Sequence, residues 1–379
     1  MRRRIGAVLL ACMAWAAAFA YAAEDAPRSA VAKVRERCVA ILERAMDGEN
    51  AFVRSAAVRS AGESEDPALL GLLKKGAADS YPTARLFALQ ALKKSFPGEI
   101  VSAAKALRND TDLWVRAKAL EILAEAGGKD AVSLIEPYLN DPDPPVRLSA
   151  AASLYIIGEK ARLPVLLDAL KGNDPAMRYQ AIGYLGQLDG AEVKSHLAGL
   201  LADAEDETVF YALQAMGEKP DPGLFPKLKE LARHKNPSVR YQAVLALGFL
   251  RTPSAVARIE ESCGDEDGMV RLAAAVSLDR LGSGACRKVF ADSLEHPDFG
   301  IRSAAARALG TAKLPSRARL LAIALKDENS RVRTAAVRAV GMMGGAEAFP
   351  LLLQALDDPL EVVRAYAAGN MIKLLRIGE

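Results

Sequence analysis

The sequence predicts an all-α fold, an α-solenoid (superhelix) of about eleven helix pairs, each 31 residues long. One position holds Arg in ten of eleven occurrences spaced 31 residues apart, and the position three residues later holds Ala in all eleven. A fixed period over most of a chain predicts stacked repeats, in which each unit packs only against its neighbours. The ten arginines are Arg54, Arg85, Arg116, Arg147, Arg178, Arg240, Arg271, Arg302, Arg333 and Arg364, and Val209 takes the sixth place.

The first helix of each repeat is predicted from an apolar position twelve residues before the Arg. This position holds Leu42, Leu73 and Ile135 among others, and prolines such as Pro67 and Pro253 stand near the predicted start. A proline is tolerated there because the first turn of a helix leaves its N–H groups unbonded. These features predict one helix in the first half of every repeat.

The turn between the two helices carries acidic residues. Asp stands six residues before the Arg position in seven repeats, and Asp or Asn often stands four residues before it, where it can cap the next helix. An arginine at a helix N-terminus opposes the helix dipole and needs an anionic partner. We therefore predict a structural Asp–Arg ladder across neighbouring repeats. Its aspartates are Asp79, Asp110, Asp141, Asp203, Asp265, Asp327 and Asp358.

The second helix begins near the Arg. Apolar residues recur one place before it and three, four and seven places after it, as in Val146, Ala150, Ala151 and Leu154. These positions share one face of a helix with 3.6 residues per turn. Gly follows the helix in six repeats, where it can terminate the helix. We expect stacking of these units to give a curved rod whose terminal helices have polar outer faces.

Units of the form D-P-x-x-x-V-R-x-x-A-A-x-x-L-G, such as Asp141–Leu154, resemble HEAT repeats. The resemblance covers roughly residues 30–376 and is strongest to the short HEAT repeats of bacterial and phycobilisome-lyase-type proteins. The matching residues are those that stack repeats. The resemblance therefore implies a fold, and it implies protein binding and scaffolding, with a few enzymatic branches.

The N-terminus predicts export. Arg2, Arg3 and Arg4 precede an uncharged apolar run from residue 5 to residue 20, and Ala20-Tyr21-Ala22 provides a cleavage site. This pattern is typical of a secretory signal peptide at residues 1–22, which leaves a single solenoid at residues 23–379 in the periplasm or outside the cell. The alternatives are an uncleaved anchor, or a lipoprotein modified at Cys12 in the lipobox-like stretch Leu9-Leu10-Ala11-Cys12.

Charge and cysteine content restrict the partners further. The chain has 50 basic and 47 acidic residues, and removal of residues 1–22 removes three Arg and no acid, leaving 47 of each. This balance gives no overall attraction to nucleic acid or to anionic membranes, although it permits a local patch. We expect no nucleic-acid partner, no membrane insertion after signal cleavage, and a monomer. We expect Cys263 to be a core residue with no disulfide to Cys286, because the helix ends that carry them should lie on opposite sides of the layer.

Catalytic patterns are missing from the sequence. The three histidines, His196, His234 and His296, are widely separated, and the sequence has no His-Glu dipeptide, phosphate-binding loop, nucleophile elbow or zinc-ligand spacing. We predict that the protein is not an enzyme and has no catalytic residue, no metal and no cofactor.

The remaining candidate site is the exposed face of the second helices, at positions two, five and nine after the Arg. In the fifth to seventh repeats this face combines amides with aromatic rings, a composition suited to binding protein or peptide. The predicted partner-binding residues are Gln180, Gln187, Tyr211, Gln214, Gln242 and Phe249. The neighbouring Tyr179, Phe210 and Tyr241 could instead fill space between repeats. The same face becomes more basic toward the C-terminus.

Two functions remain. The first is a non-enzymatic exported scaffold or adaptor that binds a protein or peptide on the concave face of a HEAT solenoid. The alternative is a lyase-like or chaperone-like HEAT protein that acts on a cofactor-bearing client. The missing catalytic patterns and the predicted export favour the scaffold.

Overall fold

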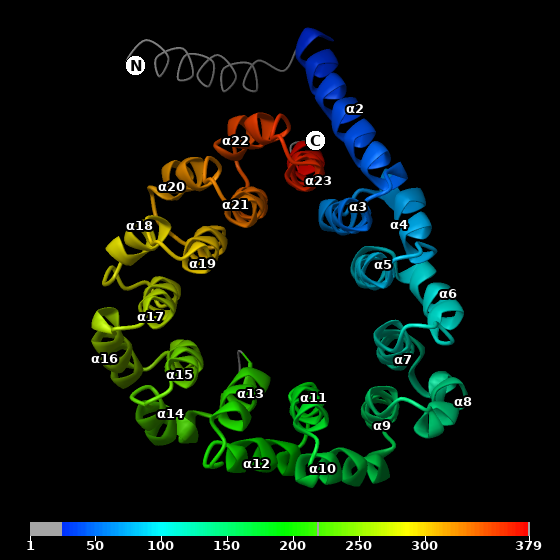
Figure 1. Ribbon diagram of the computed structural model, residues 1–379, viewed down its shortest axis with the longest axis vertical. Coiled ribbons are helices and arrows are strands. Elements are labelled where there is room, and N and C mark those ends of the chain that lie inside the picture. Colours follow the sequence, from blue (N-terminus) through cyan, green and yellow to red (C-terminus); the bar gives the residue numbers. More distant parts are fainter. Residues whose placement is uncertain (1–24, 218–219, 378–379) are drawn as a thin grey trace. The chain divides into compact units, whose positions relative to one another are not determined.

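The computed structural model describes residues 25–217 and 220–377. In this part of the chain the helices form eleven successive pairs, and the predicted all-α solenoid is confirmed (Figure 1). The predicted signal peptide, residues 1–22, and the alternative lipid site at Cys12 lie outside the described residues.

Apart from α2, the first helices of the pairs are short, and several begin or end in a 3₁₀ turn. They are α2 (Asp25–Asp47), η1 (Pro67–Leu69) with α4 (Leu70–Ala77), α6 (Pro97–Leu107), η2 (Gly128–Ala131) with α8 (Val132–Ile135) and η3 (Glu136–Asn140), η4 (Lys160–Arg162) with α10 (Leu163–Lys171), α12 (Ala191–Leu200), η5 (Pro222–Leu224) with α14 (Phe225–Leu231), α16 (Pro253–Glu261) with η6 (Ser262–Gly264), α18 (Lys288–Leu294), α20 (Arg317–Ala324) and α22 (Ala348–Ala355).

The second helices carry the ladder positions. They are α3 (Ala51–Ser64), α5 (Pro82–Ser95), α7 (Leu113–Gly127), α9 (Pro144–Ile157), α11 (Pro175–Leu185), α13 (Asp206–Met216), α15 (Pro237–Leu250), α17 (Gly268–Arg280), α19 (Phe299–Leu309), α21 (Ser330–Met343) and α23 (Glu361–Ile377).

The described chain divides into two compact units. Unit 1 comprises residues 25–91, 302–311 and 315–377, and unit 2 comprises residues 92–301 and 312–314. In each unit the first helices form an outer layer and the second helices an inner layer (Figure 1). We refer to them below as outer and inner helices.

The start and the packing of each inner helix follow from local chemistry. Asp112 caps α7 by accepting hydrogen bonds from the backbone N–H groups of Trp114 and Val115. The apolar positions predicted to face the core are buried, as in Val115 and Leu123. Neighbouring inner helices approach closely at glycine, since a Cβ at Gly248 would lie 2.7 Å from the side chain of Ser277 on α17. Small residues therefore set the spacing of the inner layer.

The ladder arginines bridge consecutive repeats. The Nε and Nη2 of Arg240 donate to the carboxylate of Asp265 in the next repeat at 2.9 and 2.8 Å, while its Nη1 donates to the His234 and Lys235 carbonyls of its own turn. The Asp265 carboxylate also accepts from the backbone N–H of Asp267. The same Arg-to-Asp pairing occurs at Arg54–Asp79, Arg116–Asp141, Arg302–Asp327 and Arg333–Asp358.

These ion pairs are largely withdrawn from solvent, because the side chains of Arg240 and Asp265 are 9% and 13% exposed. Burial alone would raise the pKa of the Asp265 carboxyl. The hydrogen bonds from Arg240 and Asp267 N–H, with the charges of Arg240 and Arg271, outweigh burial and hold that pKa below its ordinary value. Asp265 is therefore stably ionised in the folded protein.

Several other ladder residues make the same bonds to the backbone of their own turns. Arg85 and Arg147 donate to the carbonyls of Asp79 and Asp141 in their own turns, and Arg364 donates to Asp358 and Pro359 carbonyls and pairs with Glu361. Asp110 and Asp203 accept from the backbone N–H groups of Asp112 and Glu205.

One pairing that follows from the predicted ladder is wrong, and the gap at Val209 is bridged in another way. Arg178 pairs with Glu205 at 2.6 Å instead of Asp203, because Glu205 stands at the capping position and its longer side chain reaches Arg178. Where Val209 replaces Arg, the pairing is reversed in direction, since Asp206 of that repeat accepts from Asn236 and lies 3.6 Å from His234 in the next repeat.

The first and last repeats pack against each other within unit 1, where α23 lies on α2 and α3. The Ser60 hydroxyl donates to the Ala365 carbonyl at 2.7 Å, and a Cβ at Gly369 would clash with Ser60. Arg338 and Arg376 form ion pairs with Glu63 and Glu65 across this contact. The first and last repeats, which a rod would keep apart, are therefore in contact within unit 1.

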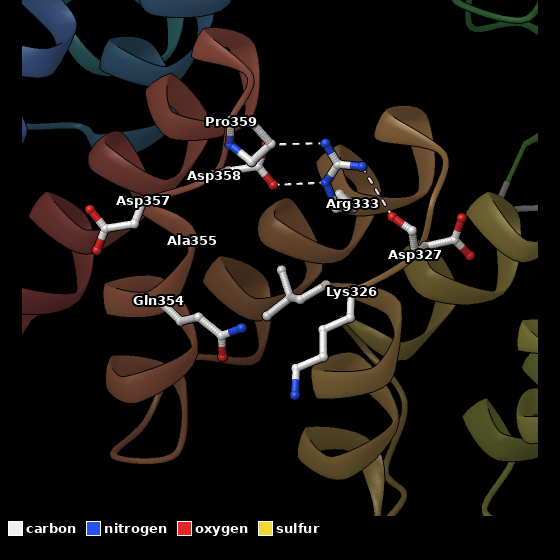
Figure 2. A pocket seen from close by; sticks show the side chains of 9 residues that line it. Lys326, Asp327, Arg333, Gln354, Ala355, Asp357, Asp358 and Pro359 are labelled. Atoms are coloured by element: carbon white, nitrogen blue, oxygen red, sulfur yellow. Dashed lines mark hydrogen bonds and ion pairs between the residues drawn. The ribbon is translucent and has the colours of Figure 1, made fainter.

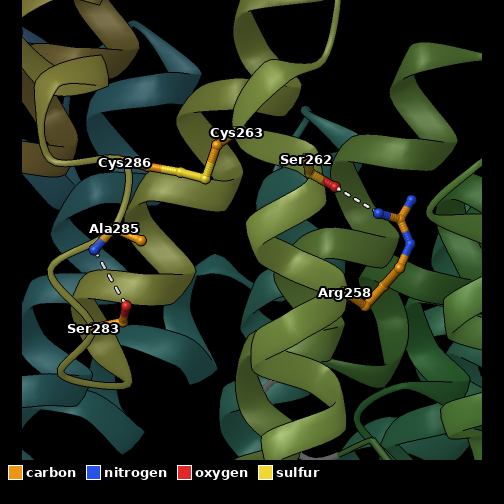
Figure 3. Close-up of a disulfide and its surroundings, with 6 residues drawn as sticks. All are labelled: Arg258, Ser262, Cys263, Ser283, Ala285 and Cys286. Carbon is orange, nitrogen blue, oxygen red and sulfur yellow. Dashed lines mark hydrogen bonds between the residues drawn. A yellow bond between two sulfur atoms is a disulfide. The ribbon is translucent and has the colours of Figure 1, made fainter.

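The expected absence of a disulfide was also wrong. Cys263 and Cys286 are bonded, with Cα atoms 5.7 Å apart (Figure 3). Cys286 does not begin a helix as expected, because α18 starts only at Lys288. The preceding loop turns through positive φ angles at Gly282 and at Cys286 itself, and this loop brings Cys286 back to the end of η6. The remaining described cysteine, Cys38, is a buried free thiol, and burial raises its pKa to about 12.

The ladder predicts that two arginines at the same position of their repeats contribute differently to stability. Arg240→Ala leaves the Asp265 carboxylate buried and short of its partner, whereas Arg271→Ala removes bonds to the carbonyls of Asp265 and Glu266. We expect Arg240→Ala to lower the free energy of unfolding by about 1–3 kcal/mol more than Arg271→Ala. Urea denaturation of both variants measures this difference, and equal losses would show that the carboxylate bridge adds no stability.

The disulfide predicts sensitivity to reductant. Reduction of Cys263–Cys286 frees a loop with a sequence separation of 23 residues. We expect reduction to lower the free energy of unfolding by about 2–4 kcal/mol. A variant with both cysteines replaced by Ser is the control, because its melting temperature should not respond to reductant. Complete reduction by thiol titration with an unchanged melting temperature in the parent protein would contradict this prediction.

Candidate partner-binding face

Three consecutive inner helices of unit 2 position the six predicted partner-binding residues. Gln180 lies on α11 with Gln187 just beyond its end, Tyr211 and Gln214 lie on α13, and Gln242 and Phe249 lie on α15. Gln187 and Gln214 are exposed, and the other four are half-buried. We call these six residues, with Tyr179 and Phe210, the amide–aromatic face.

Aromatic rings form the centre of this face. The Tyr179 and Tyr211 rings stack with centroids 4.4 Å apart and an interplanar angle of 21°. Phe210 meets the Tyr211 ring edge-on at 5.3 Å. All three rings also pack on the core of unit 2, so Tyr211 does not simply point away from it as expected. The Tyr211 ring is consequently held in one orientation, with part of its surface open to a partner.

Glu205 fixes the orientation of Tyr179. The Tyr179 hydroxyl donates to Glu205 Oε1 at 2.6 Å, and Arg178 Nη1 and Thr208 Oγ1 donate to Oε2 at 2.6 and 2.7 Å. The bond to Glu205 is the main cause that raises the pKa of Tyr179 to about 12. The bonds from Tyr179, Thr208 and Arg178 lower the pKa of Glu205. Both groups thus keep fixed roles as donor and acceptor.

Sequence reasoning missed Glu205 because it occupies a position assigned to helix capping. The available signal was its length, since the equivalent position holds Asp or Asn in eight of the other repeats. A side chain one methylene longer can reach the preceding repeat, and in this structure it bonds both Arg178 and Tyr179.

The amides of the face differ in their surroundings. Gln180 Nε2 donates to the Pro145 carbonyl at 3.1 Å and to the Tyr184 hydroxyl at 3.3 Å. Its Oε1 is buried and has no hydrogen-bond partner among the described residues. Among the described residues, the Gln187 side chain makes a single long hydrogen bond, from Nε2 to the Gly183 carbonyl at 3.5 Å. The Gln180 side chain is therefore held in place by its hydrogen bonds, whereas Gln187 and Gln214 are exposed amides that can adapt.

Phe249 is not a free apolar contact. The Arg280 guanidinium lies 4.1 Å from the centroid of its ring, in the geometry of a cation–π interaction. A partner that reaches this end of the face would meet the guanidinium together with the ring. The face thus changes from amide and aromatic at α11 and α13 to cationic and aromatic at the end of α15.

A hollow of about 440 Å³ lies in unit 1 between the ends of two repeats. Figure 2 shows that its wall contains Arg333, whose Nε donates to Asp358 at 2.7 Å and whose Nη1 donates to the Asp327 carbonyl at 3.0 Å. Arg333, Asp327 and Asp358 in this hollow are thus already engaged in the ladder. The hollow is part of the contact between two repeats.

The three histidines lie apart from one another. His234 and His296 replace the ladder Asp, and the Nδ1 of each accepts the backbone N–H two residues later, at 3.1 and 3.0 Å. His196 is exposed on α12. Within residues 25–217 and 220–377, no three His, Cys, Asp or Glu side chains gather as metal ligands would. In the same residues, no helix combines the length and hydropathy of a membrane span.

Comparison with solved structures finds distant helical relatives. The chain is 19% identical to human deoxyhypusine hydroxylase in complex with glycerol, at a TM-score of 0.32, covering 66% of this chain and 97% of that one. It is 14% identical to Kap121p, at a TM-score of 0.40, covering 88% of this chain and 45% of that one. It is 20% identical to YibA of Escherichia coli, at a TM-score of 0.38, covering 74% of this chain and 97% of that one.

Comparison with protein families gives a direct assignment. No curated protein matches the sequence. The family model described as HEAT repeats matches residues 100–173, 210–279, 263–327 and 287–372. These matches cover more than half of the chain and follow the helix pairs of both units. The chain therefore belongs to the HEAT-repeat family.

Proposed function

We propose that this protein is a non-enzymatic, exported scaffold of the short bacterial HEAT type that binds a protein or peptide on the amide–aromatic face. The Tyr179–Tyr211 stack carries the proposal. It is a rigid, half-buried aromatic surface on the inner layer, with exposed amides beside it. Interface hot spots are enriched in such aromatic anchors.

The hydrogen-bonding groups of the face support a peptide-like partner. The exposed amides of Gln187 and Gln214 can both donate and accept. A flat ring flanked by amides suits a polypeptide, because each residue of an extended chain offers an N–H and a C=O beside apolar groups.

The titrating groups of the face support a binding role over catalysis. A general acid or base works best when its pKa lies near the operating pH. Glu205 and Tyr179 are shifted away from neutrality, since the pKa of Glu205 is lowered and that of Tyr179 is raised to about 12. The Tyr179 hydroxyl is also hydrogen-bonded to the Glu205 carboxylate, and this bond holds the Tyr179 ring in place.

The disulfide supports export. Disulfides persist in oxidising compartments such as the periplasm and are rare in the cytosol. The Cys263–Cys286 bond joins η6 to the loop before α18 in unit 2 (Figure 3). Together with the predicted signal peptide at residues 1–22, it favours a periplasmic or secreted protein.

Tyr211→Ala tests the proposed binding face. The substitution removes the ring that stacks on Tyr179, and we expect the affinity for a partner captured from periplasmic extract to fall by about tenfold or more. Because the ring also packs on the core, we expect a moderate loss of melting temperature as well. Tyr211→Phe keeps the ring and should retain most of the partner affinity and most of the melting temperature.

A matched control removes a tyrosine from the outer layer. Tyr138 lies on η3 in the same unit, so Tyr138→Ala should leave the partner affinity unchanged. Equal affinity of the Tyr211→Ala and Tyr138→Ala proteins would place the functional surface elsewhere. A captured client that carries a chromophore, and that is altered by the protein, would instead support the lyase-like or chaperone-like alternative.

A further inference from the structure

The inner helices of unit 1 differ in charge from those of unit 2. At positions two, five and nine after the ladder position, unit 1 carries four cationic residues and one acidic residue, Glu63. The same positions of unit 2 carry three residues of each sign. The cationic residues of unit 1 are Arg59, Arg307, Arg338 and Lys373. A chain whose predicted mature form is neutral thus concentrates positive charge on one surface.

The contact between the first and last repeats assembles part of this surface. Glu63 Oε1 lies 3.1 Å from Arg59 Nε and 2.5 Å from Arg338 Nη2, so two guanidinium groups share one carboxylate. Each guanidinium also lies over an aromatic ring, Arg59 over Phe87 at 4.9 Å and Arg338 over Tyr366 at 5.4 Å. The rings and the carboxylate fix both side chains and leave a net positive charge.

Arg307 extends the positive surface onto α19. Its helix packs on α21 through Gly310, where a Cβ would lie 3.0 Å from the Ala339 backbone. Arg307 is exposed, and its side chain has no hydrogen-bond or ion-pair partner in the part of the chain that the structure describes. One turn beyond Arg338, the side chain of Met342 is 57% exposed and adds an apolar group beside the charges.

We propose that Arg59, Arg307, Arg338 and Met342 form a docking surface for an acidic protein segment. Carboxylates of the segment pair with Arg307 and with the remaining donors of Arg338, and an apolar side chain of the segment rests on Met342. Guanidinium groups match carboxylates in a two-point geometry, as the pair of Arg338 with Glu63 already demonstrates.

A protein segment fits this surface better than a phosphate polymer does. Met342 offers an apolar contact to a side chain of a protein segment, and a phosphate polymer has no apolar group to place on it. The proposal rests on the proposed function in one respect, that the ligand is a protein. It does not depend on the amide–aromatic face, which lies in the other unit.

The test measures binding of a short fluorescein-labelled peptide rich in Glu and Leu to the purified mature protein by fluorescence anisotropy. The comparison peptides replace Glu by Gln or by Lys. We expect the Glu peptide to bind best and its affinity to fall as salt is raised. We expect Arg307→Gln to weaken the Glu peptide by about tenfold, because a hydrogen bond to a charged group is lost. Arg319→Gln, which removes an exposed arginine from α20 in the outer layer of the same unit, should leave the affinity unchanged.

A substitution that should tighten binding controls for variants that bind less because they are misfolded. Glu63→Gln removes the carboxylate that competes for Arg59 and Arg338, and we expect it to tighten Glu-peptide binding several-fold. Equal losses for Arg307→Gln and Arg319→Gln would overturn the proposal, as would tighter binding of inorganic polyphosphate than of the Glu peptide. Because the peptide is synthetic, a negative result here leaves the Tyr211 experiment, and with it the proposed function, untouched.

Discussion

The structure depends on the ladder arginine, whose side chain bonds both to its own turn and to the next repeat. A ladder arginine such as Arg240 holds two carbonyls of its own turn and the carboxylate of Asp265 in the next repeat. That carboxylate also holds the turn of the next repeat through the N–H of Asp267. Since the pair is largely withdrawn from solvent, neither partner can be removed without leaving a poorly solvated charge. Each turn is thereby fixed relative to the next turn.

Because the turns are fixed, the inner helices are aligned. Residues at the same position of successive repeats therefore lie side by side on one surface. Positions two, five and nine after the Arg form neighbouring rows on the inner layer of each unit. In unit 2 the row at position two brings Tyr211 beside Tyr179, which stands one place after the Arg of the preceding repeat, and the two rings stack. In unit 1 the same rows bring Arg338 and Arg59 to one carboxylate, Glu63. The repeats share one framework, and their exposed rows determine the chemistry that each unit presents.

The sequence predicted what recurs and missed what occurs once. The helix pairs and the Arg-to-Asp bridges follow from columns that repeat every 31 residues, because regular packing requires the same residue at the same place. The bridge from Arg178 to Glu205 depends on one longer side chain, and the Cys263–Cys286 bond depends on a loop with positive φ angles. The contact of Ser60 with Ala365 joins residues 305 apart, which no local pattern can indicate.

The candidate site was predictable to a similar extent. The positions of its six residues on α11, α13 and α15 followed from helical periodicity, whereas their partners did not. A helical face can be found from spacing alone. The cation over Phe249 and the buried, unpaired oxygen of Gln180 come from side-chain directions set by neighbouring repeats. Those details decide which groups remain available to a partner.

Hydrogen–deuterium exchange on the mature protein, with and without a captured partner, tests most directly whether binding occurs on the inner layer of unit 2. If the partner lies on the amide–aromatic face, amides of α11, α13 and α15 should exchange more slowly in the complex. Those of the outer helices α10, α12 and α14 should change little. Protection confined to the outer helices would contradict the assignment of the binding surface.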